Sequence, residues 1–307
     1  MDPDCGVERV GFEMEEKNGM QRLYHTALLS SLLLIMLNCE SPTQQPTILP
    51  ADTLSFDRVL IPAGEFLSFD GLQLIDLDYD YRIMRYELTI REYVDYLQAV
   101  LDEGLVIRKP EGIFGYYRGD SLYEAGEYIY YHLNHPANHI GFWEDSLIVT
   151  PGYEDHPLGG ISWFGALAFA EYYGGSLPTC YEWVKAATGL SGYEFPWGEE
   201  FDSCRANFFS SGDSYDNGST PVGYYNGEVR DGYPTLENIS QYGLYDMAGN
   251  ISEYTTQLFR HKDGIVVTTL GGDWACAVHH MRAWDKLAID PLGGHPAFGL
   301  RVIWREE

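Results

Sequence analysis

The chain has 307 residues, 45% of them apolar and 15% aromatic, which is enough to bury the core of one large domain or of two small ones. A net charge of −27 would repel phosphate backbones, so the composition excludes nucleic acid as an expected partner. The five cysteines form no CxxC pair and no finger-like set with histidine, which argues against a structural zinc site and a disulfide-dense scaffold. A pair between Cys180 and Cys204 stays open, because sequence spacing alone cannot decide it.

The N-terminal sequence is typical of an export signal that follows a short extension. We interpret the polar and acidic residues 1–19 as a non-native extension and Met20 as the true start. Residues 20–38 contain an arginine and then an apolar run of about a dozen residues, which is too short to span a bilayer and suits a signal peptide. The run ends at Cys39, which begins a polar tether over residues 39–55. This arrangement resembles the cleavage box of bacterial lipoproteins.

The resemblance implies a lipid on Cys39 and therefore a membrane partner reached through that lipid anchor. It also implies a location at the bacterial outer membrane, with the rest of the chain displayed at the cell surface. A plain cleaved signal peptide and an uncleaved anchor stay open as alternatives.

The first globular residues predict two strands and a helix. Strand-like runs occupy residues 56–69 and 81–87. The sequence Thr89-Ile-Arg-Glu is a capping box, and the apolar spacing after it predicts an amphipathic helix to about Leu101. Residues 104–156 are rich in glycine, tyrosine and histidine without a clear period, so we expect a long, loop-like insertion there.

Two further helices and a final strand are expected after the insertion. Ser162 is placed to cap a helix that runs to Tyr173 and is closed by two glycines. A second capping box begins at Thr179 and predicts a helix to about Thr188. Turns and short segments follow, and residues 299–304 read as a strand. Few helices among many short strands, without an internal repeat, predict an α+β fold.

Eight short sequence blocks then occur in a fixed order between Phe56 and Trp304. They are His156-Pro with Ile161-Ser-Trp, Gly174-Gly-Ser-Leu-Pro-Thr-Cys-Tyr-Glu-Trp, Tyr193-Glu-Phe-Pro-Trp-Gly, Arg205-Ala-Asn, Pro221-Val-Gly, Tyr242-Gly-Leu-Tyr-Asp-Met-Ala-Gly-Asn-Ile-Ser-Glu-Tyr, Gly271-Gly-Asp-Trp and Phe298-Gly-Leu-Arg-Val. In this order the blocks resemble the formylglycine-generating-enzyme, or sulfatase-modifying, family. The resemblance implies one domain over residues 56–307 with a C-type lectin fold: loop-rich, with two or three helices and short antiparallel strands.

The catalytic pair of the family is incomplete in this chain. The oxidases of the family use two cysteines five residues apart, whose thiolates hold copper and activate oxygen. The first position matches Cys276, but the second is Met281. One thiol cannot form a two-thiolate site, so we expect no catalytic residue, no copper and no enzyme. His279 and His280 leave an alternative open, namely an extracytoplasmic oxidase or a related metal-dependent enzyme.

Residues 271–303 resemble the variable regions of diversity-generating retroelements, including those of the treponemal variable lipoproteins. In such systems, randomised asparagine codons cannot become glutamine, glutamate, lysine, methionine or tryptophan. None of these types occurs at the thirteen positions that we predict to vary and bind ligand, which are Ala275, Cys276, Ala277, His279, His280, Asp285, Leu287, Ala288, Ile289, Asp290, His295, Pro296 and Ala297.

The resemblance implies a binding protein whose partner is a variable protein or another host or microbial surface ligand. A few contact residues suffice to change a partner, because binding energy concentrates in few side chains. We expect the thirteen positions to sit together and mostly exposed, with Trp274, Arg282 and Arg301 held by packing or hydrogen bonds. Two alternatives stay open: a decayed enzyme that has drifted, and an envelope lipoprotein with one fixed partner.

The resemblance also implies two structural calcium sites. The first would use the side chains of Asp246 and Glu253 with the carbonyls of Gly249 and Ile251. The second would use Asn207, Asp213 and the carbonyls of Phe208 and Tyr215, with a one-residue shift in spacing. Oxygen donors of these kinds suit a hard cation. The alternative is that these polar groups only bond the backbone in turns.

Overall fold

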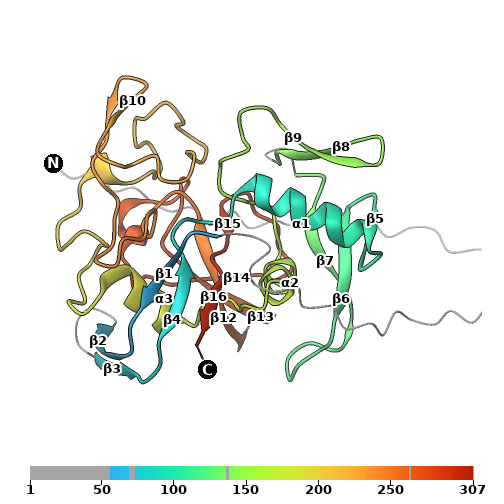
Figure 1. Ribbon diagram of the computed structural model, residues 1–307, viewed down its shortest axis with the longest axis horizontal. Helices are drawn as coiled ribbons and strands as arrows, with labels where there is room; N and C mark the ends of the chain where they lie inside the picture. The colour runs from blue at the N-terminus through green and yellow to red at the C-terminus, as the bar shows by residue number, and fades with distance from the viewer. Residues whose placement is uncertain (1–55, 69–72, 136–137, 263, 307) are drawn as a thin grey trace, which may run out of the picture. The chain divides into compact units, whose positions relative to one another are not determined.

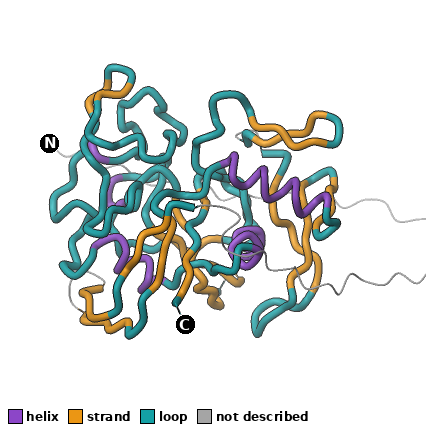
Figure 2. The backbone as a smooth tube through the Cα atoms, viewed as in Figure 1, coloured by secondary structure: helices purple, strands orange, loops and turns teal. Residues whose placement is uncertain are grey.

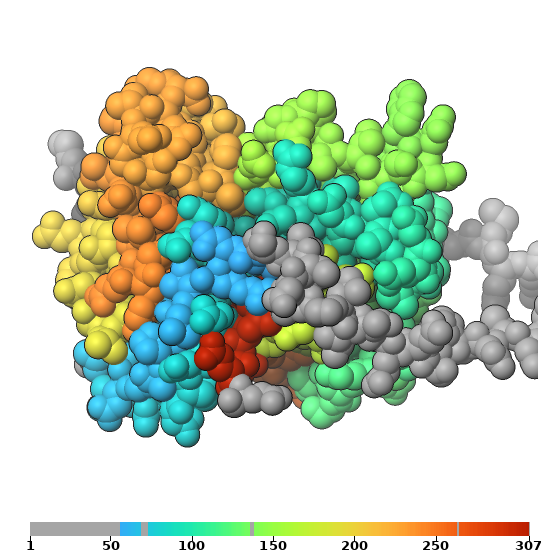
Figure 3. Space-filling model, viewed as in Figure 1, coloured from blue at the N-terminus to red at the C-terminus, as the bar shows by residue number. Residues whose placement is uncertain are grey.

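The computed structural model describes residues 56–306 except 69–72, 136–137 and 263. The predicted extension, signal peptide, tether and lipidated Cys39 lie outside the described residues. The first and last strands of the described chain meet in one antiparallel sheet of order β1-β4-β16, formed by Arg58–Ile61, Tyr81–Met84 and Ile303–Arg305. Ile303 lies opposite Ile83 in this sheet, so the last described strand pairs with a strand near the start of the described residues (Figure 1). The blue and red ends are adjacent in Figure 3.

The described residues form three α-helices, and all three were predicted from their N-terminal residues. They are α1 (Ile90–Asp102), α2 (Trp163–Tyr172) and α3 (Cys180–Thr188). Thr89 and Thr179 each form the expected capping box with the glutamate three residues later. The Ser162 hydroxyl accepts a hydrogen bond from the Gly165 amide. Caps of this kind satisfy amides that have no partner inside the helix, so helix starts are readable from sequence.

The insertion at 104–156 is not the loop that its sequence suggested. Three antiparallel strands form a sheet of order β5-β6-β7, namely Val106–Lys109, Gly112–Tyr117 and Gly126–His132. A hairpin of β8 (Ile140–Trp143) and β9 (Ser146–Val149) follows. The pairing of β6 with β7 shifts register between Ile113 and Phe114. Such a bulge interrupts the two-residue alternation by which a strand is recognised in sequence.

A four-stranded sheet carries the C-terminal segment of interest. Its order is β14-β13-β12-β15, formed by Leu287–Ile289, Gly264–Leu270, Ser252–His261 and Phe298–Gly299. The long β12–β13 hairpin was not predicted, although an Asp-Gly pair between β-branched and aromatic residues is a known hairpin signal. Strand β14 lies at one edge of the sheet, so part of the predicted variable segment is fixed by backbone pairing.

The remaining elements are short and separated by turns, as Figure 2 shows. They are the β2–β3 hairpin (Gly64–Ser68 and Gln73–Leu77), the β10–β11 pair (Val229–Arg230 and Tyr233–Pro234) and two 3-10 turns, η1 (Ser203–Arg205) and η2 (Val278–Met281). The α+β architecture agrees with the predicted fold class. Among the described residues, the helices are too short or too polar to cross a bilayer.

Two large hydrophobic clusters, and a small third one around Met281, hold the described elements together. The first surrounds Phe169 of α2, whose ring meets the rings of Phe56, Tyr93, Tyr96 and Tyr173 at centroid distances of 5.0–6.1 Å. Edge-to-face and tilted ring pairs at such distances add to the free energy of simple burial. The second cluster centres on Trp183 of α3, which is fully buried against the β1-β4-β16 sheet.

Candidate functional site

The predicted variable segment begins at a tight turn after β13. Gly271 and Gly272 both have positive φ, at +96° and +67°. A Cβ atom on Gly272 would lie 2.6 Å from the His280 carbonyl oxygen. Only glycine fits both the backbone conformation and this close approach. The two glycines therefore determine where the segment leaves the sheet.

Twelve of the thirteen predicted binding residues have exposed or half-buried side chains. Ala297 is the exception and corrects the prediction: it is fully buried, and its carbonyl accepts a hydrogen bond from the Ser252 amide. Arg301 is fully buried, and Arg282 donates to Glu194, as expected of framework residues. Trp274 is half-buried, and its backbone amide donates a hydrogen bond to the Asn250 carbonyl at 3.1 Å.

Two of the predicted positions, Ala277 and His279, border a cavity of about 520 Å³. It is lined by Glu194, Phe195, Glu199, Phe201, Ala277, Val278, His279 and Arg282. The ring centroids of His279 and His280 lie 3.9 Å apart with the rings tilted by 44°, and His280 Nδ1 lies 2.6 Å from a carboxylate oxygen of Asp285. The cavity thus has one wall from the predicted variable segment and another from residues 194–201.

Another predicted position, His295, lies near the insertion. The Nε2 atom of His132 is 2.8 Å from the Leu292 carbonyl oxygen, and the rings of His135 and His295 are 6.4 Å apart. Burial lowers the pKa of His295, and the Asp273 carboxylate, which accepts a hydrogen bond from the Cys276 thiol, opposes this shift. The insertion therefore contributes to the surface around the predicted variable positions, which its sequence did not reveal.

The Cys276 thiol lies in an unreactive environment. Burial, followed by the nearby Asp273 carboxylate, raises the pKa of Cys276 to about 12. The Sγ atom donates a hydrogen bond to Asp273 Oδ2 at 3.2 Å. In the metal-free chain this sulfur is therefore a thiol at neutral pH, and the thiolate is the nucleophilic form.

The position of the second family cysteine is filled by a core residue. The Met281 side chain is fully buried with Phe195 and Ala248, and Cys276 packs against this cluster. Within the described residues, no three His, Cys, Asp or Glu side chains converge as a metal site. The donor set around Cys276 does not fit a copper ion held by two thiolates. The three cysteines among the described residues are free thiols, so the disulfide between Cys180 and Cys204 that the sequence left open does not form.

Glu253 belongs to a buried ion pair, which corrects the first calcium assignment. Its Oε1 accepts from Arg301 Nε and its Oε2 from Trp183 Nε1, each at 2.7 Å, and all three side chains are fully buried. A divalent cation on this carboxylate would face the guanidinium charge at close range. Residues Asp246, Gly249, Ile251 and Glu253 therefore do not fit calcium.

Two more carboxylates complete this buried group. Glu87 accepts from the Asn250 side-chain amide and the Ile251 backbone amide, at 2.8 and 3.2 Å. Asp246 Oδ2 accepts from the Gly223 amide at 2.5 Å. Burial raises the pKa of Asp246 to about 6 and that of Glu87 well above its usual range. Neither Glu87 nor this network was singled out from the sequence.

The second predicted calcium set does come together. The Ser211 hydroxyl lies 2.8 Å from Asp213 Oδ2, 3.5 Å from Asn207 Oδ1 and 3.4 Å from Asp216 Oδ1. The carbonyl groups of Phe208 and Tyr215 belong to the same loop, where they accept backbone hydrogen bonds. Asp216 was missed, although two aspartates three residues apart in a glycine-bounded loop were a usable signal. The three side-chain oxygens are of the type that suits a hard cation, and each lies within hydrogen-bond distance of the Ser211 hydroxyl.

A family model for the sulfatase-modifying factor enzyme 1-like domain matches residues 45–306. The serine/threonine-protein kinase Pkn1 of Chlamydia trachomatis is 41% identical over 172 residues, which is 50% of this chain and 25% of the kinase. The inactive C-alpha-formylglycine-generating enzyme 2 of Bos taurus is 30% identical over 157 residues, covering 48% of this chain and 50% of that protein. The matched part of the chain thus spans a quarter to a half of the length of these two relatives.

Two solved structures share the fold. PvdO from Pseudomonas aeruginosa has a TM-score of 0.55 at 19% identity, covering 86% of this chain and 99% of that one. Treponema denticola variable protein 1 has a TM-score of 0.53 at 16% identity, covering 84% and 98%. The architecture is the loop-rich C-type lectin fold of the formylglycine-generating-enzyme type. Because the eight blocks occur in order and the family model matches a range that includes every described residue, the chain belongs to the family of sulfatase-modifying factor enzyme 1-like domains.

Proposed function

We propose that the chain is a non-catalytic ligand-binding protein, displayed on a lipid anchor, whose predicted variable segment sets its specificity. The environment of Cys276 carries the proposal. The thiol is protonated at neutral pH, and Met281 fills the place of the partner cysteine inside the core. A copper site with two thiolates would lack its second sulfur there, whereas twelve of the thirteen predicted contact positions are exposed or half-buried.

The geometry also supports tolerance to change at these positions. The fold depends on buried groups outside the predicted variable set, such as Trp183, Phe169 and Arg301. Exposed substitutions away from such groups change the free energy of unfolding by about 0.5 kcal/mol or less. The cavity beside His279 then offers a pocket whose shape and polarity change with residues 277 and 279.

A paired assay and a genomic observation test this function. The parent and the Cys276→Ser variant, each supplied with copper and oxygen, should leave a cysteine-containing sulfatase peptide unmodified by mass spectrometry. Formation of formylglycine by the parent, lost in Cys276→Ser, would instead establish the oxidase alternative. Retroelement diversification further requires a nearby reverse-transcriptase gene and an asparagine-rich near-copy of the codons for residues 271–303.

A matched pair of alanines tests the tolerance of the segment. Ala277 is exposed and Ala297 is fully buried. Ala277→Tyr should leave the free energy of unfolding within about 0.5 kcal/mol, whereas Ala297→Tyr should lower it by about 1–3 kcal/mol through overpacking. Urea unfolding measures both. Equal losses in the two variants would show that the segment is not built to vary.

The lipid anchor is a separate part of the proposal, motivated by the signal-like run that ends at Cys39. Cys39→Ala should move the protein out of the membrane fraction or leave an unprocessed precursor. Unchanged fractionation, together with no incorporation of radioactive fatty acid by the parent, would remove the anchor.

We further propose that calcium binds the loop of Asn207, Asp213 and Asp216 and stiffens it. Calcium at 100 times its dissociation constant should stabilise the parent by about 2.7 kcal/mol, because only the folded chain presents the site. Asp216 is exposed, so Asp216→Ala should remove this gain without disturbing the core. Thermal unfolding in calcium and in chelator measures the effect. The exposed control Glu228→Ala should respond like the parent; identical responses from all three proteins would exclude the site.

A further inference from the structure

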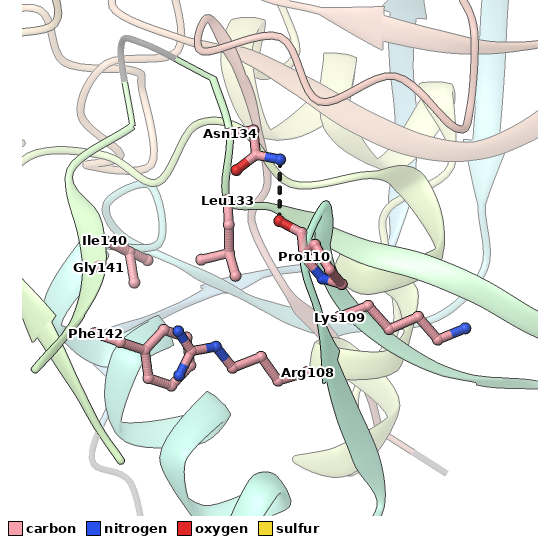
Figure 4. A pocket seen from close by; sticks show the side chains of 8 residues that line it. All are labelled: Arg108, Lys109, Pro110, Leu133, Asn134, Ile140, Gly141 and Phe142. Carbon is pink, nitrogen blue, oxygen red and sulfur yellow. Dashed lines mark hydrogen bonds between the residues drawn. The ribbon is translucent and has the colours of Figure 1, made fainter. Parts of the chain in front are cut away.

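We propose that a cavity in the insertion binds a small monocarboxylate with a planar, apolar body. The cavity has a volume of about 520 Å³ and lies between β5, the turn after β7, and β8. Figure 4 shows it from close by. None of its lining residues belongs to the predicted variable segment, so the site is independent of the function proposed above.

The Arg108 guanidinium is fixed but not neutralised. Its central carbon lies 3.7 Å from the centroid of the Phe142 ring, so one face of the guanidinium is held by the aromatic ring. Among the described residues no carboxylate pairs with Arg108, although the whole chain has 46 acidic residues against 19 basic ones. An arginine left without an acid in such a chain keeps its charge and its N–H groups available for an external anion.

The neighbouring lysine does not share this role. The Lys109 ammonium forms an ion pair with Glu127 and lies over the Phe114 ring. In Figure 4 it points away from Arg108 and Phe142. The cavity therefore presents one available positive charge, which balances a monoanion. A dianion would meet the same single charge against the strongly acidic background of the chain.

Apolar side chains form part of the remaining lining. Leu133, Ile140 and Pro110 line the cavity beside the Phe142 ring. The Asn134 side-chain nitrogen is engaged by the Pro110 carbonyl at 3.0 Å, as the dashed line in Figure 4 marks. The open face of a guanidinium stacks on a planar group, and the N–H groups at its edge donate hydrogen bonds to a carboxylate. A flat monocarboxylate can therefore pair its charge with Arg108 and place its apolar body against the apolar side chains. Small-molecule sites usually combine an apolar surface with few polar groups in this way.

Phenylacetate is the probe, with phenylacetamide as its neutral analogue and phenyl phosphate as a dianion. Ligand-observed NMR titration of the full chain should show saturable binding of phenylacetate. The amide and the phosphate should each bind at least about tenfold more weakly, since about 1.4 kcal/mol separates each decade of affinity. Failure of phenylacetate to bind, equal binding of the amide, or tighter binding of the phosphate would each overturn the proposal.

Variants assign the effect to Arg108. Arg108→Gln should abolish phenylacetate binding without changing the melting temperature, because the side chain is exposed. Phe142→Leu should weaken binding by loosening the guanidinium. Arg118→Gln is the matched control, since Arg118 lies in the same insertion but is paired with Glu171; it should bind like the parent. Binding that persists in Arg108→Gln, or falls equally in Arg118→Gln, would contradict the assignment.

Discussion

Replacing Arg301 by alanine is expected to lower the free energy of unfolding by about 3–5 kcal/mol. The guanidinium donates to Glu253 at 2.7 Å and to the Arg85 carbonyl at 2.6 Å, and it is fully buried. Its removal leaves the Glu253 charge without a partner in the core, and that uncompensated charge dominates the loss. Urea unfolding at neutral pH measures the effect.

Two further variants isolate the cause. Adding Glu253→Gln to Arg301→Ala removes the orphaned charge and should recover part of the loss, which a double-mutant cycle quantifies. Arg82→Ala breaks an exposed pair with Glu306 and should cost about 1 kcal/mol or less. A similar loss from Arg82→Ala and Arg301→Ala would mean that burial of the pair is unimportant.

Asp246 is expected to make the protein less stable as the pH rises from about 4 to about 6. Burial raises the pKa of Asp246 from 3.8 to about 6 in the folded chain. Between these values the folded state binds the proton more tightly than the unfolded state does. The contribution is therefore complete below about pH 4 and lost above about pH 6, and a shift of this size corresponds to about 3 kcal/mol.

Glu87 adds to the same slope, because burial also raises its pKa. Asp246→Asn should flatten the dependence of unfolding free energy on pH in this window, whatever its effect at a single pH. Asp290→Asn, at an exposed position, should keep the parent's slope. Denaturation midpoints at pH 4 and 7 decide the matter, and an unchanged slope in Asp246→Asn would refute the assignment.

Local features of the fold were predictable, and long-range ones were not. The helix starts at Thr89, Ser162 and Thr179 were found because a cap lies within a few residues of the groups that it satisfies. The strands of the insertion were missed because a bulge disturbs the alternation of β6. Their stability depends on packing against distant residues, such as the ring of Phe164 on Tyr128.

The site follows the same division. The block around Asp246 identified carboxylates correctly but not their use, because the cation that pairs with Glu253 is Arg301, 48 residues further along the chain. The resemblance to variable regions led us to expect exposure at the thirteen named positions, and this expectation failed at Ala297. Alanine is small enough for either the surface or the core, so its identity carries no information about burial.

The arrangement of the last residues has a consequence for how errors in the gene would be filtered. Arg301 and β16 follow the segment 275–297 directly, and both are needed to close the structure onto Glu253 and β4. A frameshift or stop codon introduced upstream of them would delete the final strand and leave a buried acid unpaired. Faulty copies would then fail to fold and fall to proteolysis, while in-frame changes at exposed positions would pass. The described chain can therefore fold only if the reading frame stays intact through Arg301 and β16.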